Sequence, residues 1–317
     1  MIETLLISYP DQAEFKAYHL KPATHGDLRI CNWAGKITSY KVRDASIDAQ
    51  FASGLSEAPH KHIASETQHC AMVDRCVASI LTGAADKVVL SRIKRISSKS
   101  IDIQIALARL RSALPQACVF YLHTAAHGAW LCASPELLLE KKAGQYMTMA
   151  LAGTRAWNGS LDYVWSEKDS QEQDVVTQYI TDLCDQNGWP YELSDRYTRR
   201  AGTLAHLCTD ISIHTDLEIQ KVLSALHPTP AICGTPRESA KSMIDDLEAH
   251  DRDLYCGYLH MDHGDRSAAY VILRCAAIYS DAVDIYVGGG INRMSISQDE
   301  WQETELKSRS IMAALEE

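Results

Sequence analysis

Three strand-like runs follow one another between residues 255 and 289, with only short polar stretches between them. They read YCGYLHM, SAAYVILRCAAIYS and AVDIYVGG, and each contains the β-branched or aromatic residues that strands favour. Hairpin-like strands of this kind, combined with separate helical patterns, are typical of an α+β fold rather than of a regular βαβ winding. These runs therefore predict an α+β protein.

The rest of the chain adds further helices and strands. Apolar residues at helical spacing predict helices at residues 64–82, 100–113, 166–186, 217–226, 237–250 and within 295–315. Alternating or β-branched runs predict strands at residues 86–96, 117–123 and 128–133. The first 60 residues are expected to form peripheral strands and loops. Ser166 and the acids after it predict a capped helix start, and Ser297 and Glu300 have the spacing of a capping box.

Length and charge exclude several classes of protein. The 317 residues contain no visible linker or repeat, so we expect a single domain over residues 1–317. The formal net charge of -10 argues against binding to nucleic acid or to an acidic membrane surface. Neither a signal peptide nor an apolar run long enough to cross a bilayer is visible, which favours a cytoplasmic protein. Ten dispersed cysteines without a CxxC pair favour reduced thiols.

Two acidic segments lie on predicted helices. The first contains Glu167, Asp169, Glu172 and Asp174, and the second contains Asp299, Glu300, Glu303 and Glu305. Each cluster could be an ordinary solvated helix face. Alternatively, one carboxylate from each helix could hold a divalent cation such as Mg²⁺, which typically binds one or two carboxylates and keeps water or substrate in its other positions.

Two turn-forming segments and a set of histidines complete the candidates. The segment VGGGI (287–291) ends a strand with three glycines, which permits close backbone approach and leaves N–H groups for an anion. The segment HPTPAICGTP (227–236) is tightly constrained, and its Cys233 has no partner base nearby, so a buried thiol is the favoured interpretation. No zinc spacing supports a metal role for the histidines, which are expected on the surface and in turns, at positions 60, 62, 69, 260 and 263.

Ten segments, taken in order, resemble the chorismate-utilising enzymes, which include isochorismate, salicylate, anthranilate and aminodeoxychorismate synthases. The segments are KVVLSR (87–92), ASPELLLE (133–140), LAGTR (151–155), EKDSQEQDVV (167–176), LAHLCT (204–209), LHPTPAICGTPRESA (226–240), RDLYCGYL (252–259), VILRCAAI (271–278), IYVGGGI (285–291) and EWQETELK (300–307). The resemblance covers residues 64–317, whereas residues 1–60 match poorly. It implies a single α+β chorismate-binding domain with two packed β-sheets and surrounding helices, as in anthranilate synthase component I.

The resemblance also assigns site residues. It implies that Glu172 and Glu303 hold Mg²⁺, which binds the ring carboxylate of chorismate, with Glu300 and either Glu167 or Asp169 nearby. Gln173 stands where the family more often has histidine. The residues implied to bind or line the substrate site are Gly153, Thr154, His206, Ala231, Tyr255, Arg274, Gly288, Gly290 and Lys307. Among them, Arg274 and Tyr255 would bind the enolpyruvyl carboxylate, for which a planar guanidinium and a phenol are suited.

Lys87 and Glu136 select the reaction that the resemblance implies. Lys87 matches the general base of members that add water at ring carbon 2, and Glu136 matches the acid that protonates the departing C4 hydroxyl. The base must lose its proton, which burial and nearby positive charge favour, and the acid must keep its proton, which an apolar setting favours. The expected activity is thus an Mg²⁺-dependent isochorismate synthase.

The segment HPTPAICG (227–234) also resembles the form that this segment takes in isochorismate synthases. Thr229 and Ala231, rather than Cys233, are expected to touch the substrate. The alternatives are a salicylate synthase, which also eliminates pyruvate, and a non-catalytic chorismate-binding homologue. No glutamine amidotransferase subunit is expected, a monomer or homodimer is anticipated, and the pathway stays open between menaquinone, siderophore and salicylate.

Overall fold

The computed structural model describes residues 2–47, 54–97, 101–201 and 204–316. Its helices are α1 (Glu66–Leu81), α2 (Ile103–Ala113), α3 (Glu167–Asn187), α4 (Ile219–Leu226), α5 (Arg237–Leu247) and α6 (Ser297–Leu315). Its strands in the first half of the chain are β1 (Thr4–Ser8), β2 (Lys16–Pro22), β3 (Leu28–Cys31), β4 (Ile37–Ala45), β5 (Lys87–Ser97), β6 (Cys118–Thr124), β7 (Gly128–Ser134), β8 (Leu137–Lys142) and β9 (Gln145–Ala156). The later strands are β10 (Tyr191–Leu193), β11 (Tyr197–Ala201), β12 (Leu204–Ile213), β13 (Gly234–Thr235), β14 (Tyr258–Asp262), β15 (Arg266–Val271), β16 (Cys275–Ile278) and β17 (Ala282–Ile291).

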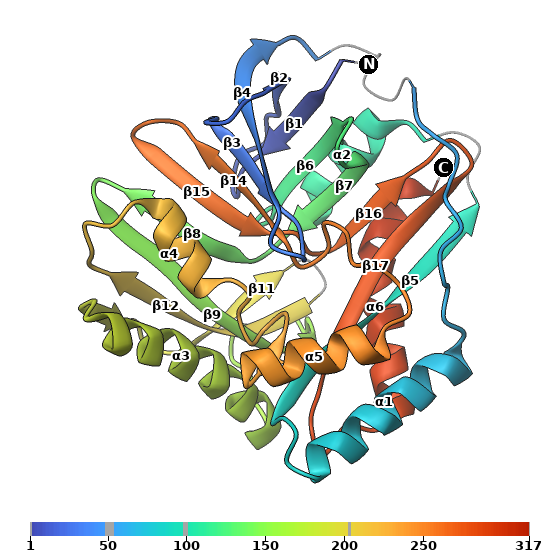
Figure 1. Ribbon diagram of the computed structural model, residues 1–317, viewed down its shortest axis with the longest axis vertical. Coiled ribbons are helices and arrows are strands. Elements are labelled where there is room, and N and C mark those ends of the chain that lie inside the picture. The colour runs from blue at the N-terminus through green and yellow to red at the C-terminus, as the bar shows by residue number, and fades with distance from the viewer. Residues whose placement is uncertain (1, 48–53, 98–100, 202–203, 317) are drawn as a thin grey trace.

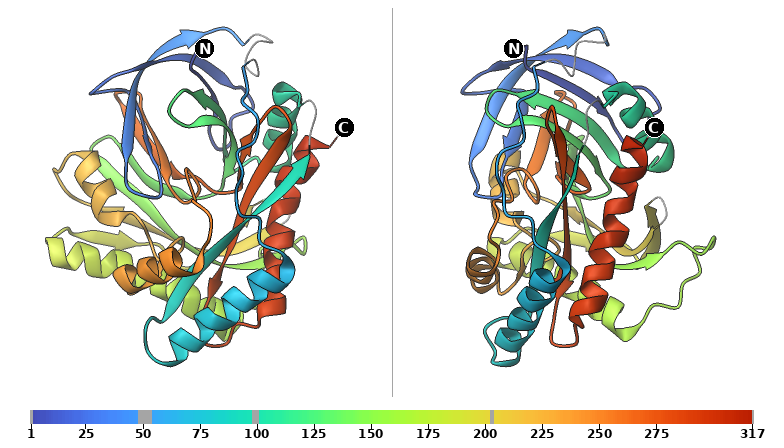
Figure 2. Two further views of the ribbon diagram at one scale, coloured as in Figure 1. Left: turned by 45° about the vertical axis from the view of Figure 1, so that its right-hand side comes forward. Right: turned by 90° about the vertical axis from the view of Figure 1, so that its right-hand side faces the viewer.

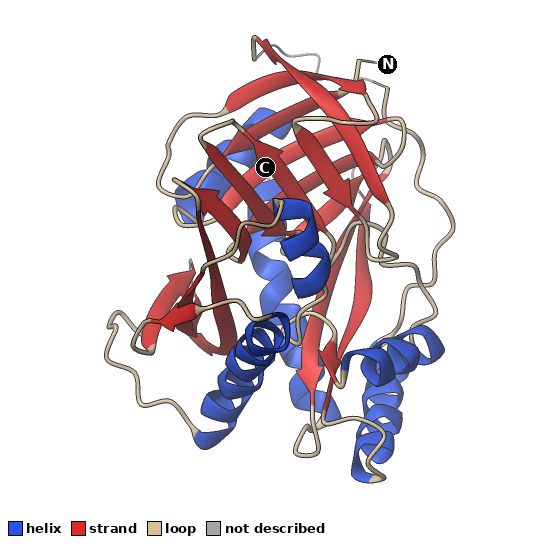
Figure 3. Ribbon diagram, turned by 60° about the vertical axis from the view of Figure 1, so that its left-hand side comes forward, coloured by secondary structure: helices blue, strands red, loops and turns tan. Residues whose placement is uncertain are grey.

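Antiparallel pairings link the strands into one ladder, which confirms the predicted α+β class. From β10 and β11, the order is β12, β9, β8, β15, β14, β3, β4, β2, β1, β6, β7, β16, β17, β5 and β13. The two ends of this ladder form separate groups of strands, and the helices lie around them (Figures 1 and 3). Strands β9 and β12 from one end and β5 and β17 from the other line the same pocket.

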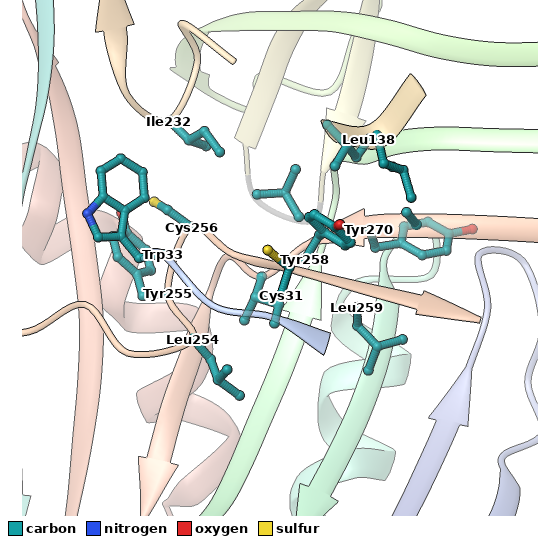
Figure 4. Packing of buried hydrophobic residues seen from close by; sticks show 14 of the residues in the cluster. Cys31, Trp33, Leu138, Ile232, Leu254, Tyr255, Cys256, Tyr258, Leu259 and Tyr270 are labelled. Carbon is teal, nitrogen blue, oxygen red and sulfur yellow. The ribbon is translucent and has the colours of Figure 1, made fainter. Parts of the chain in front are cut away.

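The first 45 residues are built into the ladder rather than lying at its periphery. Strands β1 to β4 connect β14 to β6. Leu5, Ile7, Leu28 and Ile30 are fully buried in the main core. Leu254, Tyr255 and Cys256 belong to the same core, and Tyr255 and Cys256 lie close to Trp33 (Figure 4).

Helix α6 covers β17 and also packs against α1 and α2 (Figure 2). Its predicted capping box is wrong. The N-cap residue is Ile296, which offers no side-chain oxygen, and the Glu300 carboxylate instead accepts a hydrogen bond from the Ser295 hydroxyl at 2.6 Å. The capped start predicted for α3 is confirmed, because Ser166 and Asp169 form a reciprocal capping box.

The strand expected at residues 267–280 is broken into β15 and β16. Arg274 lies in the break with a left-handed φ of 46°. The break arises because β15 pairs with β14 and β8, whereas β16 pairs with β7 and β17. The strand expected from residue 255 likewise begins only at Tyr258, because Cys256 has a left-handed φ of 64°.

Two other expectations concern cysteines and membranes. All ten cysteines are free thiols, as predicted. Among the described residues, no helix is both long and apolar enough to cross a membrane.

Candidate active site

One pocket of about 190 Å³ brings together all thirteen positions that the sequence assigns as the proposed base and acid, the substrate-binding residues and the metal ligands. These positions are Lys87, Glu136, Gly153, Thr154, Glu172, His206, Ala231, Tyr255, Arg274, Gly288, Gly290, Glu303 and Lys307. They come from both ends of the strand ladder and from α3 and α6. The location of the set is therefore a structural fact, whereas the role of each residue stays a prediction.

Lys87 begins β5 and is buried, with 7% of its surface exposed. Its side chain extends over Gly290 of β17: a Cβ atom built on Gly290 would lie 2.7 Å from Lys87 Cε and 3.3 Å from Nζ. Only a glycine leaves this space, so the close approach of β17 determines where the ammonium group lies. The backbone of Lys87 is held by β13, in which Thr235 pairs with Lys87.

Glu136 lies in the connection between β7 and β8 and is 6% exposed. Its backbone N–H donates to Ser134 Oγ at 3.2 Å, which fixes the turn that directs the side chain. Burial raises the pKa of Glu136 to about 7, and the positive charge of Lys87 opposes this rise. A carboxyl group with such a pKa can keep its proton near neutral pH and donate it.

Arg274, His206 and the segment at Gly153 form a connected group. His206 Nδ1 lies 2.9 Å from the Gly153 carbonyl oxygen, and a carbonyl can only accept, so Nδ1 carries the proton. Burial and the nearby guanidinium lower the pKa of His206 to about 3, which keeps the ring neutral. His206 Nε2 is then free to accept a hydrogen bond from Arg274 Nη2 at 3.4 Å.

The left-handed conformation of Arg274 and this contact direct its guanidinium into the pocket. Burial lowers the pKa of Arg274 to about 10, so the group still carries its charge at neutral pH. A half-buried guanidinium in an apolar wall is a strong site for a carboxylate.

Tyr255 and the glycines of β17 approach each other closely. A Cβ atom built on Gly288 would lie 2.7 Å from the Tyr255 hydroxyl oxygen and 2.6 Å from the Leu90 carbonyl oxygen. The Gly288 carbonyl accepts a hydrogen bond from Lys307 Nζ at 2.9 Å. Burial raises the pKa of Tyr255, so the phenol keeps its proton and can donate it to an anion.

Glu172 on α3 and Glu303 on α6 both line the pocket. Glu303 Oε1 lies 2.6 Å from Lys307 Nζ, one turn further along α6. No group of three or more His, Cys, Asp or Glu side chains close enough to bind a metal is found among the described residues. Two carboxylates at one pocket nevertheless suit Mg²⁺, which takes hard oxygen ligands and fills its other positions with water or substrate.

The other acids implied to lie nearby differ in position. Asp169 lines the pocket and forms an ion pair with Arg155, whose Nη2 is 2.8 Å away, whereas Glu167 is exposed. Gln173 is fully buried and donates to Thr209 Oγ1 of β12 at 2.9 Å, so this departure from the family pattern joins α3 to the sheet.

The segment at residues 227–236 lines the pocket through Ala231 and Ile232. Cys233 is fully buried, which confirms the predicted buried thiol, and burial raises the pKa of this thiol to about 11. Thr229 is buried, but it is not among the residues that line the pocket.

Sequence reasoning missed several other wall residues. Tyr286 lines the pocket and stacks on Tyr255 with ring centroids 5.9 Å apart, and the tyrosine within IYVGGGI was the available signal.

The expectation that all five histidines lie on the surface is wrong for His69 and His260. The burial of His260 is tolerated because its Nε2 has a hydrogen-bond partner in the Ser267 hydroxyl, 2.6 Å away between β14 and β15.

The fold and the pocket together define an enzyme of α+β architecture whose site opposes a buried lysine and a buried acid, beside an arginine and two carboxylates. The sequence pattern of the family described as "Chorismate binding enzyme" matches residues 25–316, and the chain belongs to this family. The match therefore begins well before residue 64, the start of the ten resembling segments.

Three known proteins illustrate the similarity. The chain is 31% identical over 274 residues to isochorismate synthase EntC of Escherichia coli (strain K12), which covers 82% of this chain and 70% of that enzyme. The structure of a putative 2,3-dihydroxybenzoate-specific isochorismate synthase, DhbC, from Bacillus anthracis has a TM-score of 0.81 at 21% identity and covers 99% of this chain and 96% of that chain. Anthranilate synthase component I from Streptococcus pneumoniae TIGR4 has a TM-score of 0.68 at 19% identity, over 95% of this chain and 72% of that chain. The predicted fold is thereby confirmed.

Proposed function

We propose that this chain is an Mg²⁺-dependent isochorismate synthase that converts chorismate to isochorismate. The observation that carries the proposal is the pairing of Lys87 with Glu136 in one buried pocket, where the acid has a pKa of about 7. Membership of the chorismate binding enzymes and 31% identity to an isochorismate synthase support it.

The reaction requires one proton to be taken and one to be given. Lys87, in its neutral form, removes a proton from water as the oxygen bonds to C2 of the ring. The double bonds shift, the C4–oxygen bond breaks, and Glu136 donates its proton so that the hydroxyl leaves as water. One water enters and one leaves, so the product is an isomer of the substrate.

The remaining residues hold the substrate for this exchange. Arg274 and the Tyr255 hydroxyl would bind the enolpyruvyl carboxylate, and the contact between His206 and the guanidinium would maintain its direction. Glu172 and Glu303 would hold Mg²⁺, which when bound supplies positive charge for the ring carboxylate. Such a cation would also offset the acidic character of the chain toward a dianionic substrate.

Ala231 and Ile232 form the apolar wall beside the reacting ring. A small residue at position 231 is expected to let isochorismate leave before pyruvate is lost. We propose further that the chain acts without a glutamine amidotransferase subunit, because water rather than ammonia is the nucleophile.

The test is to incubate the pure protein with chorismate and Mg²⁺ at pH 7–8 and to separate the products by chromatography. The proposal expects isochorismate without fluorescent salicylate. Salicylate formed without an added lyase would instead identify a salicylate synthase, and chorismate binding without turnover would identify a non-catalytic homologue.

A further inference from the structure

Arg252 and Glu248 form a buried ion pair behind the pocket, outside the set of residues discussed above. Their side chains are 1% and 3% exposed, and Arg252 Nη2 and Glu248 Oε1 are 2.6 Å apart. Arg252 Nε also donates to Glu248 Oε2 at 2.8 Å, so the pair is bidentate. Burying two charges is costly, and such a pair is weak evidence for a purely stabilising role.

The guanidinium of Arg252 contacts two walls of the pocket through their backbones. Nη2 donates to the Val89 carbonyl at 2.6 Å, and Nη1 donates to the Ile232 carbonyl at 3.1 Å. Val89 lies two residues after Lys87 on β5, and Ile232 follows Ala231. Both acceptor residues line the pocket.

Arg252 also contacts a third part of the pocket, the turn that contains Tyr255. The Arg252 carbonyl accepts a hydrogen bond from the Tyr255 N–H at 2.8 Å, which closes the turn that presents the phenol to the pocket. Trp33 covers the guanidinium, with the Arg252 Cζ atom 4.3 Å from the ring centroid. Trp33 lies beside Tyr255 and Cys256 of this turn (Figure 4).

Glu248 completes the connection to β5. Its Oε1 atom accepts a hydrogen bond from the Ser91 N–H at 2.6 Å. Backbone bonds already join β5 to the segment at 232–235, for example from Val89 N–H to the Cys233 carbonyl at 2.8 Å. The Arg252–Glu248 pair therefore adds what those bonds do not provide, which is a link from both elements to the Tyr255 turn.

We propose that Arg252, held by Glu248, is a positioning residue that sets the distance between the Tyr255 hydroxyl and the Lys87 amine across the bound substrate. This inference rests on the proposed function, in which Tyr255 anchors one end of chorismate and Lys87 acts at C2. Only a guanidinium can serve here, because its separate nitrogens reach the carboxylate and both carbonyls at once. A lysine at the same position has a single nitrogen and cannot span all of them.

The test compares Arg252→Lys with Arg111→Lys. Arg111 is a matched control: it is 7% exposed and its guanidinium donates to the carbonyls of Tyr9, Ala117 and Leu114, none of which lines the pocket. The folded fraction is determined by circular dichroism, and kcat is calculated per folded molecule. We expect R252K to lower this kcat by at least about tenfold, because a small misplacement of reacting groups greatly slows the chemical step. R111K should keep kcat within about twofold of the parent chain while losing comparable thermal stability.

An R252K variant that keeps kcat within about twofold of R111K would overturn the proposal. Should R252K fail to fold, Glu248→Asp takes its place, since it keeps the charge but shortens the reach of the carboxylate, and unchanged kcat in E248D would be equally decisive against it. A parent chain that forms no isochorismate contradicts the proposed function instead. The positioning role is then judged from chorismate affinity, measured by tyrosine and tryptophan fluorescence, which R252K must weaken and R111K must not.

Discussion

Replacing Gly290 by alanine should displace the proposed base without disturbing the fold. A Cβ atom at this position would lie 2.7 Å from Lys87 Cε. Because an ordinary contact between carbon atoms is about 3.5–4.0 Å, the Lys87 side chain must move by about 1 Å. Gly290 belongs to extended β17 and pairs with Val89, so alanine fits its backbone.

The expected cost falls on the chemical step. A shift of about 1 Å in a reacting group costs on the order of 100-fold in rate, which corresponds to about 2.7 kcal/mol in activation free energy. Stability should change by less than about 1 kcal/mol, because the displaced atoms are at the end of a flexible side chain. The backbone N–H of residue 290 is retained, so chorismate binding should change little.

The assay is steady-state isochorismate formation by G290A, K87A and the double variant. If alanine acts by moving Lys87, the double variant should be no slower than K87A, since the interaction is already lost. Either of two results would refute the reasoning: G290A with kcat close to that of the parent chain, or G290A that slows the residual reaction of K87A as much as it slows the parent.

Three further predictions concern the carboxylates. Because the pKa of Glu136 is about 7 and the protonated form is the proton donor, kcat should fall as pH rises through about 7, and a profile flat from pH 6 to 8 would contradict this. The folded pKa also lies above the ordinary value of 4.5, so ionisation of Glu136 penalises the folded state as pH rises between these values. Relative to the parent chain, Glu136→Gln should therefore gain on the order of 3 kcal/mol between pH 4 and pH 8 in urea unfolding. Glu303→Gln should weaken Mg²⁺ and chorismate binding together by at least about tenfold in calorimetry, and turnover that persists in a chelator would rule out a metal enzyme.

Local sequence patterns predicted the regular elements well because their causes are local. The helix at residues 166–186 and its cap at Ser166 could both be predicted from the sequence, since they depend on residues three or four apart. The left-handed φ of Arg274 could not be predicted from the local sequence, because the break between β15 and β16 arises from their pairing with different strands. A β-branched run shows that a strand is favoured but does not show where its partners change.

The same distinction applies to the pocket. Family motifs identified residues that lie in one pocket, including Lys87 and Glu303, which are more than 200 residues apart, whereas Thr229, expected beside them, does not line it. The contacts of Arg252 could not be predicted, because its acceptors at residues 89 and 232 are backbone carbonyl oxygens. Every residue type has such an oxygen, so the sequence does not mark these two. Contacts of a side chain with distant backbone are therefore the part of a site that one sequence conceals.

The packing of Gly234 against Lys87 has a consequence for redirecting this enzyme to another product. Gly234 has a φ of 130°, and a Cβ atom there would lie 2.1 Å from the Lys87 carbonyl oxygen. The pocket-lining segment 227–236 and the strand β5, which begins at Lys87, are thus in close backbone contact. An exchange of residues 227–236 that does not keep a glycine at position 234 would therefore displace the backbone of Lys87, the proposed base, together with the pocket wall, and turnover should fall. A redesign should therefore exchange residues 227–236 together with the first residues of β5.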